Sequence, residues 1–386
     1  MTAPVFILAG EPSGDRLAAG LMKAVNSAWG QQDWIGVGGP AMRAEGLSGH
    51  DDMDALTVFG FGAALAAYPR LSRFADRLVE DIIAARPKAV FTVDVKGFSL
   101  RLAMRLKRRM AQLGWSAPVI HCVAPTVWAW GAWRRHRVAR AVDGLLCLFP
   151  FEPGYFESLD VKSHFIGHPE AFNPAYDRAQ RPQPGKPPHL TLLPGSRRGE
   201  IRHILAPMLA GFQAMRAVRP DITASIPTLP RLADEIAAVS AARGLENVIS
   251  VDHAEDALFA ALECSNAVLA ASGTVTLQTA LYGVPGIACY IAPPFSTAIG
   301  RRLVNMDRVI LPNALLGREV YPFLFQEAAT PQAMADGVLA VLADNAAQRR
   351  ATDDAVILRD KLRGGADSFE DKVVDALAEW FGPRPA

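Results

Sequence analysis

Short apolar runs alternate along most of the chain with longer segments whose apolar residues recur at helical spacing. This alternation is typical of β-α-β units and of a mainly parallel sheet. The runs predict strands at Val5–Ala9, Trp34–Val37, Ala89–Asp94, Val119–Val123, Gly144–Leu148 and Ser163–Ile166, and then at His189–Leu193, Thr223–Ile226, Val248–Val251, Ala267–Ala271 and Gly286–Tyr290. After Pro331 the pattern is helical to the end of the chain, with apolar positions at Phe369, Val373, Val374, Leu377 and Trp380.

The alternation fails between Glu170 and Pro188, where prolines and a glycine stand among polar residues. Such a segment is typical of a linker, and 386 residues are enough for two domains. We therefore predict a Rossmann-like domain over 1–170, a linker over 171–188, a second Rossmann-like domain over 189–345 and C-terminal helices over 346–386. The sequence leaves open whether those helices pack back on the N-terminal domain.

Composition narrows the class of protein. Half of the residues are hydrophobic and the formal net charge is +1, so the chain can bury two cores and has no overall charge that attracts nucleic acid. Its four cysteines form no Cys-x-x-Cys pair, which argues against structural zinc and disulfides and favours a cytoplasmic setting. No run supplies the roughly 20 apolar residues of a spanning helix, and no signal-peptide pattern begins the chain. The histidines show no metal-ligand spacing, so we expect neither metal nor cofactor.

Glycine turns follow the first predicted strand of each half. Gly10–Asp15 comes after Val5–Ala9, and Pro194–Arg197 comes after His189–Leu193. In parallel sheets of this kind, ligands bind in the crevice outside the carboxyl ends of the strands. Two such units predict two crevices, with the working site between the domains.

The second half has the features of a diphosphate site. Ser272, Gly273 and Thr274 follow a predicted strand and open a predicted helix, and free amides at a helix start favour negative charge. Arg197, in the loop with Gly195 and Ser196, has a guanidinium suited to phosphate oxygens. Gln278, one turn into the helix, can reach a ribose hydroxyl. The alternatives are an ordinary Ser or Thr cap, a surface arginine or salt bridge, and a solvated glutamine.

The first half has the features of an acceptor site. Asp94 ends a predicted strand, where a carboxylate can take a proton from an attacking hydroxyl. Its alternative role is to cap a neighbouring loop. Glu11 and Ser13 lie on the first glycine turn, where they either bind an acceptor or sugar or only shape the turn.

Two segments suit a membrane surface. The segment from Leu56 to Tyr68 is apolar and too short to span a bilayer, so it is either a core helix or a docking segment. Basic residues follow at Arg101, Arg105, Lys107, Arg108 and Arg109, and again at Trp133–Arg137 after Trp128 and Trp130. Tryptophan and arginine together are typical of a headgroup region. The competing interpretation is two ordinary helices with solvated faces.

These residues together resemble the lipid-A-disaccharide synthases over nearly the whole length. The resemblance rests on Ala9–Asp15, Gly36–Pro40 with Met42 and Gly46, Val93–Asp94 with Phe98, His121–Trp130, Pro150–Glu152, Gly167–Pro169, Leu193–Arg197 with Glu200 and Ile201, Ala271–Thr274, Pro312–Asn313, and Gln326. It implies an inverting, metal-independent glycosyltransferase of the B type, with two Rossmann-like α/β domains facing across a cleft. Its substrates would be UDP-2,3-diacylglucosamine and 2,3-diacylglucosamine 1-phosphate, and its products UDP and lipid A disaccharide 1-phosphate.

The resemblance also assigns roles to residues and a place in the cell. Asp94 would be the base for the acceptor 6-hydroxyl, Arg197 and Ser272–Thr274 would face the UDP phosphates, and Asn313 and Gln326 would line the donor pocket. The apolar segment would dock on the inner membrane, with the protein peripheral on its cytoplasmic side.

Two other functions stay open at this point. Ala63, Gln278 and Phe323 stand where such enzymes commonly carry acidic residues, which keeps a non-catalytic nucleotide-sugar-binding or membrane scaffold protein in view. The other is a different B-type sugar-nucleotide enzyme such as an epimerase, against which the Trp128–Trp130 region and the apolar segment argue.

Overall fold

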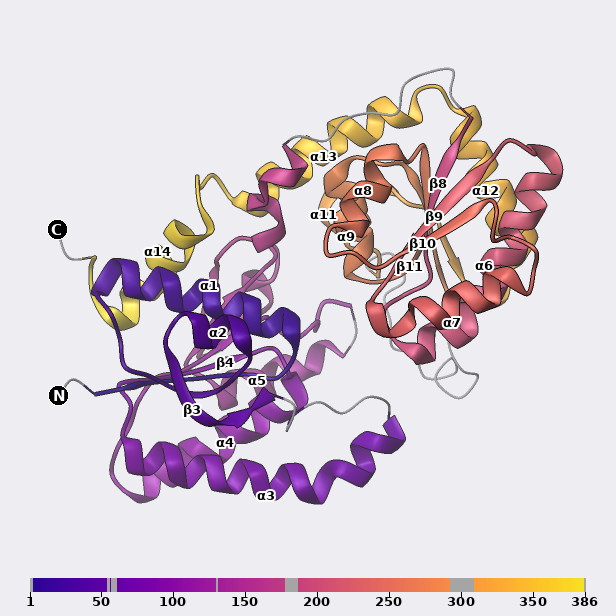
Figure 1. Cartoon of the computed structure of the whole chain (residues 1–386). Helices are drawn as coiled ribbons and strands as arrows, with labels where there is room; N and C mark the ends of the chain where they lie inside the picture. The colour runs from indigo at the N-terminus through magenta and orange to yellow at the C-terminus, as the bar shows by residue number, and fades with distance from the viewer. Residues whose placement is uncertain are drawn as a thin grey trace. The chain divides into compact units, whose positions relative to one another are not determined.

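The computed structural model describes residues 3–53, 56, 61–129, 131–177, 187–291 and 309–384, with only the backbone of 50–52 and 61–67. The chain forms two compact units (Figure 1): unit 1 is Met1–Phe172 with Leu362–Ala386, and unit 2 is Asn173–Lys361. The chain thus returns to the first unit for its last helix. The limits given above for the domains and the linker stay predictions, and the linker residues 178–186 lie outside the described part.

Unit 1 is a parallel sheet with helices on both faces. Its strand order is β3-β2-β1-β4-β5-β6-β7. The strands are β1 (Val5–Ala9), β2 (Trp34–Gly38), β3 (Leu47–Asp52), β4 (Ala89–Val93), β5 (Val119–Cys122), β6 (Gly144–Cys147) and β7 (Lys162–Phe165). The helices are α1 (Pro12–Trp29), α2 (Pro40–Ala44), α3 (Phe61–Ala85), α4 (Lys96–Gln112), α5 (Arg135–Ala141) and α14 (Phe369–Phe381), with 3-10 turns η2 (Ala132–Arg134), η3 (Pro153–Tyr155) and η4 (Pro169–Phe172).

The two faces of this sheet are covered because its strands are apolar on both sides. Val5 and Ile7 of β1 pack with α1 and α14, whereas Phe6 and Leu8 pack with α3, α4 and α5. Successive side chains of a strand point to opposite faces, so one apolar run serves two cores. The predicted apolar face of the last helix is confirmed, since Phe369, Val373, Val374 and Leu377 are buried against this sheet.

Unit 2 repeats the plan with strand order β10-β9-β8-β11-β12-β13. Its strands are β8 (His189–Leu193), β9 (Thr223–Pro227), β10 (Ile249–Asp252), β11 (Ala267–Ala271), β12 (Gly286–Tyr290) and β13 (Phe323–Phe325). Its helices are α6 (Arg198–Val218), α7 (Pro230–Ala241), α8 (Ala257–Cys264), α9 (Thr274–Tyr282), α11 (Leu311–Leu316), α12 (Pro331–Ala343) and α13 (Ala347–Arg363), and its 3-10 turns are η5 (Pro174–Tyr176) and η7 (Gln326–Ala328). The last two residues of α13 already belong to unit 1.

The predicted fold class is confirmed, because every described pair of strands in both sheets is parallel and helices pack on both faces of each sheet. Each predicted strand is present within one residue at either end. Two strands were missed. β3 reads Leu-Ser-Gly-His-Asp-Asp, with no apolar run to reveal it, and β13 is only three residues long.

Candidate functional site

Each sheet has one point where the strand order reverses. In unit 1 this point lies between β1 and β4, and in unit 2 it lies between β8 and β11. Crossover connections leave in opposite directions from such a point, and this opens the crevice where ligands bind in doubly wound sheets. The residues selected from sequence follow these four strands: Glu11 and Ser13 after β1, Asp94 after β4, Gly195–Arg197 after β8, and Ser272–Thr274 after β11.

Asp94 lies in a strained turn. β4 ends at Val93, not at Asp94 as predicted, and both Asp94 (φ 53°) and Val95 (φ 43°) adopt left-handed backbone conformations. A non-glycine residue in this region costs of order 1–3 kcal/mol and persists only where its surroundings fix it. The Asp94 amide donates to the Cys122 carbonyl (3.0 Å), and the Ser99 hydroxyl donates to the Asp94 carbonyl (2.8 Å). The turn is thus held from β5 and from α4.

Asp94 lines a cavity of about 460 Å³. Glu11, the N-cap residue of α1, lines the same cavity, so the structure brings these two predicted acceptor residues together. Ser13 is exposed in the first turn of α1 and is not part of the cavity lining. The first glycine turn must pack closely here, since a Cβ at Gly10 would lie 2.7 Å from Cγ2 of Val95.

Asp15, at the end of that glycine turn, has a structural role that the sequence did not reveal. Its buried carboxylate accepts hydrogen bonds from the backbone amides of Gly39 (2.9 Å), Ala41 (2.9 Å) and Met42 (3.1 Å). It therefore supplies the acceptor that the start of α2 lacks locally and ties α1 to the loop after β2. The partners are 24 to 27 residues away in sequence, so no local pattern announces them.

A second missed carboxylate supports the loop after β6. Glu152 is buried and accepts from the indole N–H of Trp128 (3.1 Å) and from the amides of Leu148 and Phe149 (both 3.1 Å). Burial raises its pKa to about 7, against the lowering effect of these hydrogen bonds. Phe149 and Phe151 pack around Trp128 at ring distances of 6.2 and 5.2 Å. Glu152 thus fixes Trp128 of the His121–Trp130 motif. Trp130 lies outside the described residues.

His121 and His168 are both buried, and burial is the main cause that lowers their pKa values, to about 3 and about 4. Both rings are therefore neutral near pH 7. His121 Nδ1 shares a 2.8 Å hydrogen bond with the Thr92 hydroxyl. In the part of the chain that the structure describes, no three His, Cys, Asp or Glu side chains gather as a metal site would require.

On unit 2, the loop after β8 is shaped by a glycine. Gly195 has φ 110°, and a Cβ there would lie 2.7 Å from Oε2 of Glu200. Arg197 is the N-cap residue of α6, with a side chain 65% exposed and paired to Glu200 at 3.2 Å. The salt-bridge alternative is therefore present, but an exposed pair of this kind is worth about 0–1 kcal/mol. The guanidinium can exchange this partner for a ligand phosphate at small cost.

The loop after β11 opens directly into α9. Gly273 is the N-cap residue, and no side chain caps the helix. The alternative interpretation of Ser272 or Thr274 as an ordinary cap is therefore wrong. The missing Cβ of Gly273 has no atom within 4 Å, so a ligand can approach the backbone. Uncapped amides at a helix start attract an anion. Gln278 follows one turn later; it is half-buried, and its side chain makes no hydrogen bond to a described residue.

The two remaining donor residues differ. Asn313 is committed to its own loop: its Oδ1 accepts from the amides of Val320 and Tyr321 and its Nδ2 donates to the Tyr321 carbonyl, all at 2.9 Å. It therefore shapes the chain before β13. Gln326, directly after β13, is buried with φ 55°, and its Nε2 has no hydrogen-bond partner among the described residues. A buried unpaired amide calls for an explanation, and a ligand at the carboxyl edge of this sheet would supply one.

Known proteins place the chain in a family. A model of the family described as lipid-A-disaccharide synthetase matches residues 5–376. The chain belongs to this family. Lipid-A-disaccharide synthases from Rhodospirillum centenum and Pseudomonas aeruginosa are each 36% identical to it, over 90% and 91% of this chain and 87% and 92% of their own. The family predicted from the sequence motifs is confirmed, and with it the prediction of a glycosyltransferase.

Solved structures share the fold at low sequence identity. A putative UDP-N-acetylglucosamine 2-epimerase from Listeria monocytogenes aligns over 100% of both chains with a TM-score of 0.59 and 14% identity. MurG of Acinetobacter baumannii aligns over 98% of this chain and all of its own with a TM-score of 0.58 and 14% identity. These similarities show the B-type fold alone. Family membership favours the glycosyltransferase over the epimerase.

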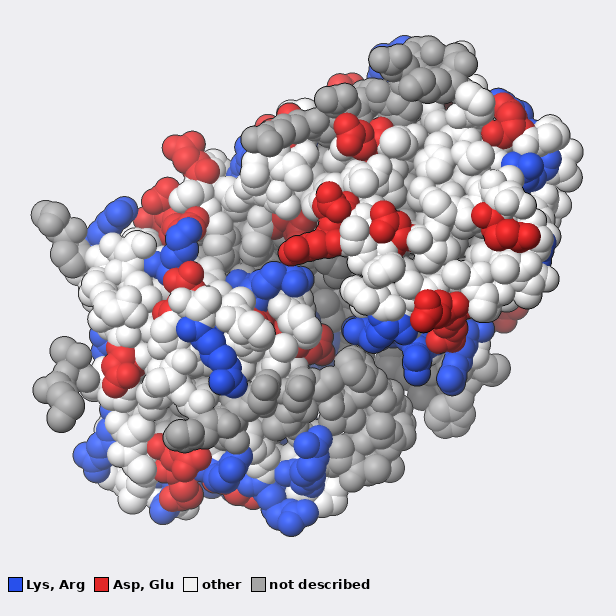
Figure 2. Space-filling view, in the orientation of Figure 1, with Lys and Arg blue, Asp and Glu red and all other residues white. Residues whose placement is uncertain are grey.

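The surface that was expected to contact the membrane carries acidic as well as basic side chains. On α4, three of the basic residues are paired: Arg105 with Asp76, Arg109 with Glu80 and Lys107 with Asp143. Figure 2 shows acidic and basic side chains interspersed along α3. For these residues the structure favours the alternative of solvated helix faces. Residues 57–60 of the apolar segment lie outside the described part of the chain.

Proposed function

We propose that this chain joins UDP-2,3-diacylglucosamine to 2,3-diacylglucosamine 1-phosphate. The acceptor 6-hydroxyl oxygen attacks the anomeric carbon of the donor with inversion, the bond from that carbon to the diphosphate breaks, and its electron pair leaves with UDP. The hydroxyl proton passes to the carboxylate of Asp94. No metal is needed in this scheme, because backbone amides and an arginine neutralise the leaving diphosphate.

One observation carries the proposal: Asp94 sits at the switch point of unit 1, in a strained turn, at the rim of a cavity. Strain of this kind concentrates at working sites. The alternative role, in which the Asp94 side chain caps a loop, has no support, since the carboxylate makes no hydrogen bond to a described residue and α4, whose N-cap is Val95, has no side-chain cap. A base at this position typically contributes about 10²–10⁴ in rate.

The donor end of the proposal rests on unit 2. Ser272–Thr274 present the uncapped start of α9, and Arg197 and Ser196 lie on the neighbouring strand end, since β8 and β11 are paired. We assign the UDP diphosphate to this edge, with Gly195 allowing the close turn. Gln326 donates its unpaired amide to the donor, Gln278 binds the ribose, and Asn313 acts through the loop that it holds.

We further propose that the protein works as a peripheral protein on the cytoplasmic side of the inner membrane. Both substrates are acylated, so their sugars are presented at a lipid surface. Trp133 is 70% exposed in η2 and is followed by Arg135 and Arg137, a pairing suited to headgroups. Among the helices described, none is both long and apolar enough to cross a bilayer.

The test is product analysis by mass spectrometry with both lipid substrates, in neutral-detergent micelles and excess EDTA. We expect disaccharide 1-phosphate and UDP in equal amounts. Loss of product in EDTA contradicts the metal-free mechanism. Binding of UDP with no disaccharide would establish the scaffold protein instead, and an altered sugar nucleotide without transfer would establish an epimerase.

Asp94→Asn tests the base directly. We expect kcat to fall by about 10²–10⁴, with UDP affinity unchanged by calorimetry because the change is confined to unit 1. Asp160→Asn, an exposed aspartate of the same unit, serves as the matched control and should retain full activity. An Asp94→Asn enzyme as fast as the wild type would remove Asp94 from the mechanism.

A further inference from the structure

The cavity beside Asp94 carries positive as well as negative charge. Besides Glu11 and Asp94, its lining includes Lys96, Arg101 and Arg105, all from α4, and Tyr68 from α3. The role proposed for Asp94 does not explain three cations at the same cavity. These three cations differ in whether a protein group already binds them.

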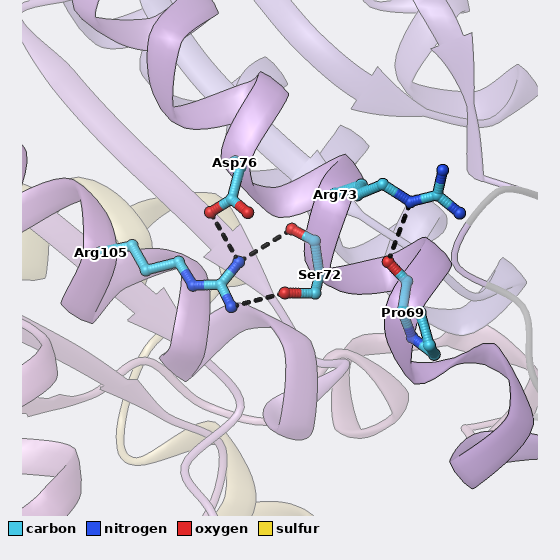
Figure 3. A network of polar contacts seen from close by, with 5 residues as sticks. All are labelled: Pro69, Ser72, Arg73, Asp76 and Arg105. Carbon is cyan, nitrogen blue, oxygen red and sulfur yellow. Dashed lines mark hydrogen bonds and ion pairs between the residues drawn. The ribbon is translucent and has the colours of Figure 1, made fainter.

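Arg105 is fully committed to the protein (Figure 3). Its Nη1 donates to the Ser72 carbonyl (2.8 Å) and to Asp76 Oδ1 (2.9 Å), and its Nη2 donates to the Ser72 hydroxyl (2.8 Å). Together these bonds fasten α4 to α3, with Ser72 and Asp76 one turn apart on the facing helix. Arg105 therefore forms a fixed part of the cavity wall and has little capacity left for a ligand.

Lys96 and Arg101 have no such commitment. Within the described part of the chain, neither side chain makes a hydrogen bond or an ion pair with a protein group, and the charge of Lys96 acts on the protein only at longer range, where it helps to lower the pKa of Glu152. Arg101 lies one turn before Arg105 and stacks its guanidinium over the ring of Tyr68, 5.0 Å from the ring centre. This contact holds the guanidinium plane while leaving its N–H edge available. Lys96 is the first residue of α4 and is half-buried.

A second cavity provides the contrast. In unit 2, a cavity of about 370 Å³ at the start of β12 is also lined by two arginines, but Arg318 is paired with Asp354 and Arg350 with Asp344. Positive charge is thus balanced by the protein itself in that cavity. At the Asp94 cavity, neither Lys96 nor Arg101 forms such an ion pair with a described carboxylate, so both can bind an anion from outside.

We propose that Lys96 and Arg101 bind the 1-phosphate of the acceptor. This inference rests on the proposed function and names the recognition element of its acceptor site. Arginine binds a phosphate through two parallel charge-assisted hydrogen bonds, and lysine adds a point charge. The phosphate lies against the cations while a hydroxyl of the same sugar lies against Asp94, so the pair sets the orientation in which the hydroxyl reacts.

The mixed charge of the cavity favours this occupant over a membrane lipid. A bilayer rich in anionic headgroups would be repelled by Glu11 and Asp94, which line the same concave surface. A sugar phosphate presents both a dianion and hydroxyl groups, and so complements both signs of charge. The apolar part of the lining, with Leu71 and Phe98, can accept the first carbons of an acyl chain.

The experiment compares Arg101→Gln, Lys96→Gln and the double variant with wild type, and Arg108→Gln, an exposed arginine of the same helix outside the cavity lining, is the control. We expect the KM for the acceptor to rise about tenfold for each cation removed, the low end for charged hydrogen bonds at a solvent-accessible site. The KM for the UDP-sugar and all constants of Arg108→Gln should stay unchanged. An unchanged acceptor KM in both single variants overturns the proposal.

An acceptor lacking the phosphate gives a second readout. Wild type should use it about a hundredfold less efficiently, and the double variant should barely distinguish the two acceptors. Equal discrimination by wild type and double variant overturns the proposal. Retained acceptor KM combined with weaker sedimentation on phosphatidylglycerol vesicles would assign the cations to lipid headgroups, which also overturns it.

A binding measurement separates this inference from the proposed function. Titration of glucosamine 1-phosphate into the full chain requires no turnover, so it tests the phosphate site even if no disaccharide forms. We expect wild type and Arg108→Gln to bind it alike, Arg101→Gln to bind about tenfold more weakly, and added salt to weaken binding to wild type. Equal affinity for glucosamine 1-phosphate in wild type and Arg101→Gln refutes the phosphate site. If Arg101→Gln binds it more weakly as expected but no disaccharide forms in the turnover assay, the proposed reaction alone is refuted.

Discussion

The buried carboxyl group of Glu152 makes the stability of unit 1 depend on pH. Burial raises its pKa from 4.5 to about 7 in the folded chain. Between these values the folded protein holds a proton that the unfolded protein releases, so stability is greatest at low pH and falls as pH rises through this window. Glu152→Gln removes the titration and keeps the shape of the side chain.

The size of the effect follows from the two pKa values. In the folded chain the carboxyl group stays protonated up to about pH 7, whereas in the unfolded chain it stays protonated only up to pH 4.5. Raising the pH from 5 to 8 therefore lowers the free energy of unfolding by about 2.5 kcal/mol. The variant loses this slope but leaves the indole N–H of Trp128 facing an amide N–H, a mismatch of about 1–3 kcal/mol at every pH. We therefore expect the stability of Glu152→Gln relative to wild type to rise by about 2.5 kcal/mol between pH 5 and pH 8, because wild type loses this amount and the variant does not.

Tryptophan fluorescence is suited to this measurement, because all seven tryptophans belong to unit 1. Urea unfolding curves at pH 5 and pH 8 give the change for each protein, and the wild-type change minus the variant change isolates Glu152. His121 and His168 are present in both proteins, so their contributions cancel. Glu157→Gln, an exposed glutamate nearby, should behave as wild type. Equal pH dependence in wild type and Glu152→Gln would refute the reasoning.

Two further substitutions test the supports of the two switch points. Asp15→Asn should lower the stability of unit 1 by about 2 kcal/mol in the same fluorescence assay, because the new amide group cannot accept from the Ala41 amide; unchanged stability would contradict the role given to Asp15. Gly195→Ala should cost unit 2 about 1–3 kcal/mol and weaken UDP binding in calorimetry, because φ 110° and the Glu200 contact both oppose a side chain. A Gly195→Ala protein that melts at the wild-type temperature by circular dichroism and binds UDP with wild-type affinity would show that this position does not require glycine.

Alternation of apolar and helical segments was enough to predict most of the sheet. Runs such as Val5–Ala9 and Ala267–Ala271 are buried on both faces, and a strand buried on both faces has a continuous apolar sequence. β3 has no such run. It is an edge strand beside β2 and is held by backbone pairing, a property that its side chains do not encode.

The candidate site could be predicted where chemistry follows a strand end, and not where it depends on distant partners. Asp94 and Arg197 could be predicted because Asp94 ends one predicted strand and Arg197 lies in the loop after another, and ligands of parallel sheets bind at the carboxyl ends of the strands. Asp15 and Glu152 were not assigned roles, since their burial and their backbone partners arise only when separate loops meet. Asn313 shows the converse: the family resemblance assigned it to the donor pocket, yet its side chain is occupied by its own loop.

The supports of Asp94 explain how a strained turn can persist at the edge of an open cavity. Left-handed Asp94 and Val95 together store a few kcal/mol, which neighbouring contacts must offset. Val95 packs so closely on Gly10 that no side chain fits there, while β5 and Ser99 fix the backbone of Asp94 on either side. Asp15 and Arg105 then fasten α1 to α2 and α4 to α3, outside the cavity itself. The Asp94 carboxylate itself makes no hydrogen bond to any residue that the structure describes, and it can therefore meet a substrate hydroxyl without giving up a structural bond.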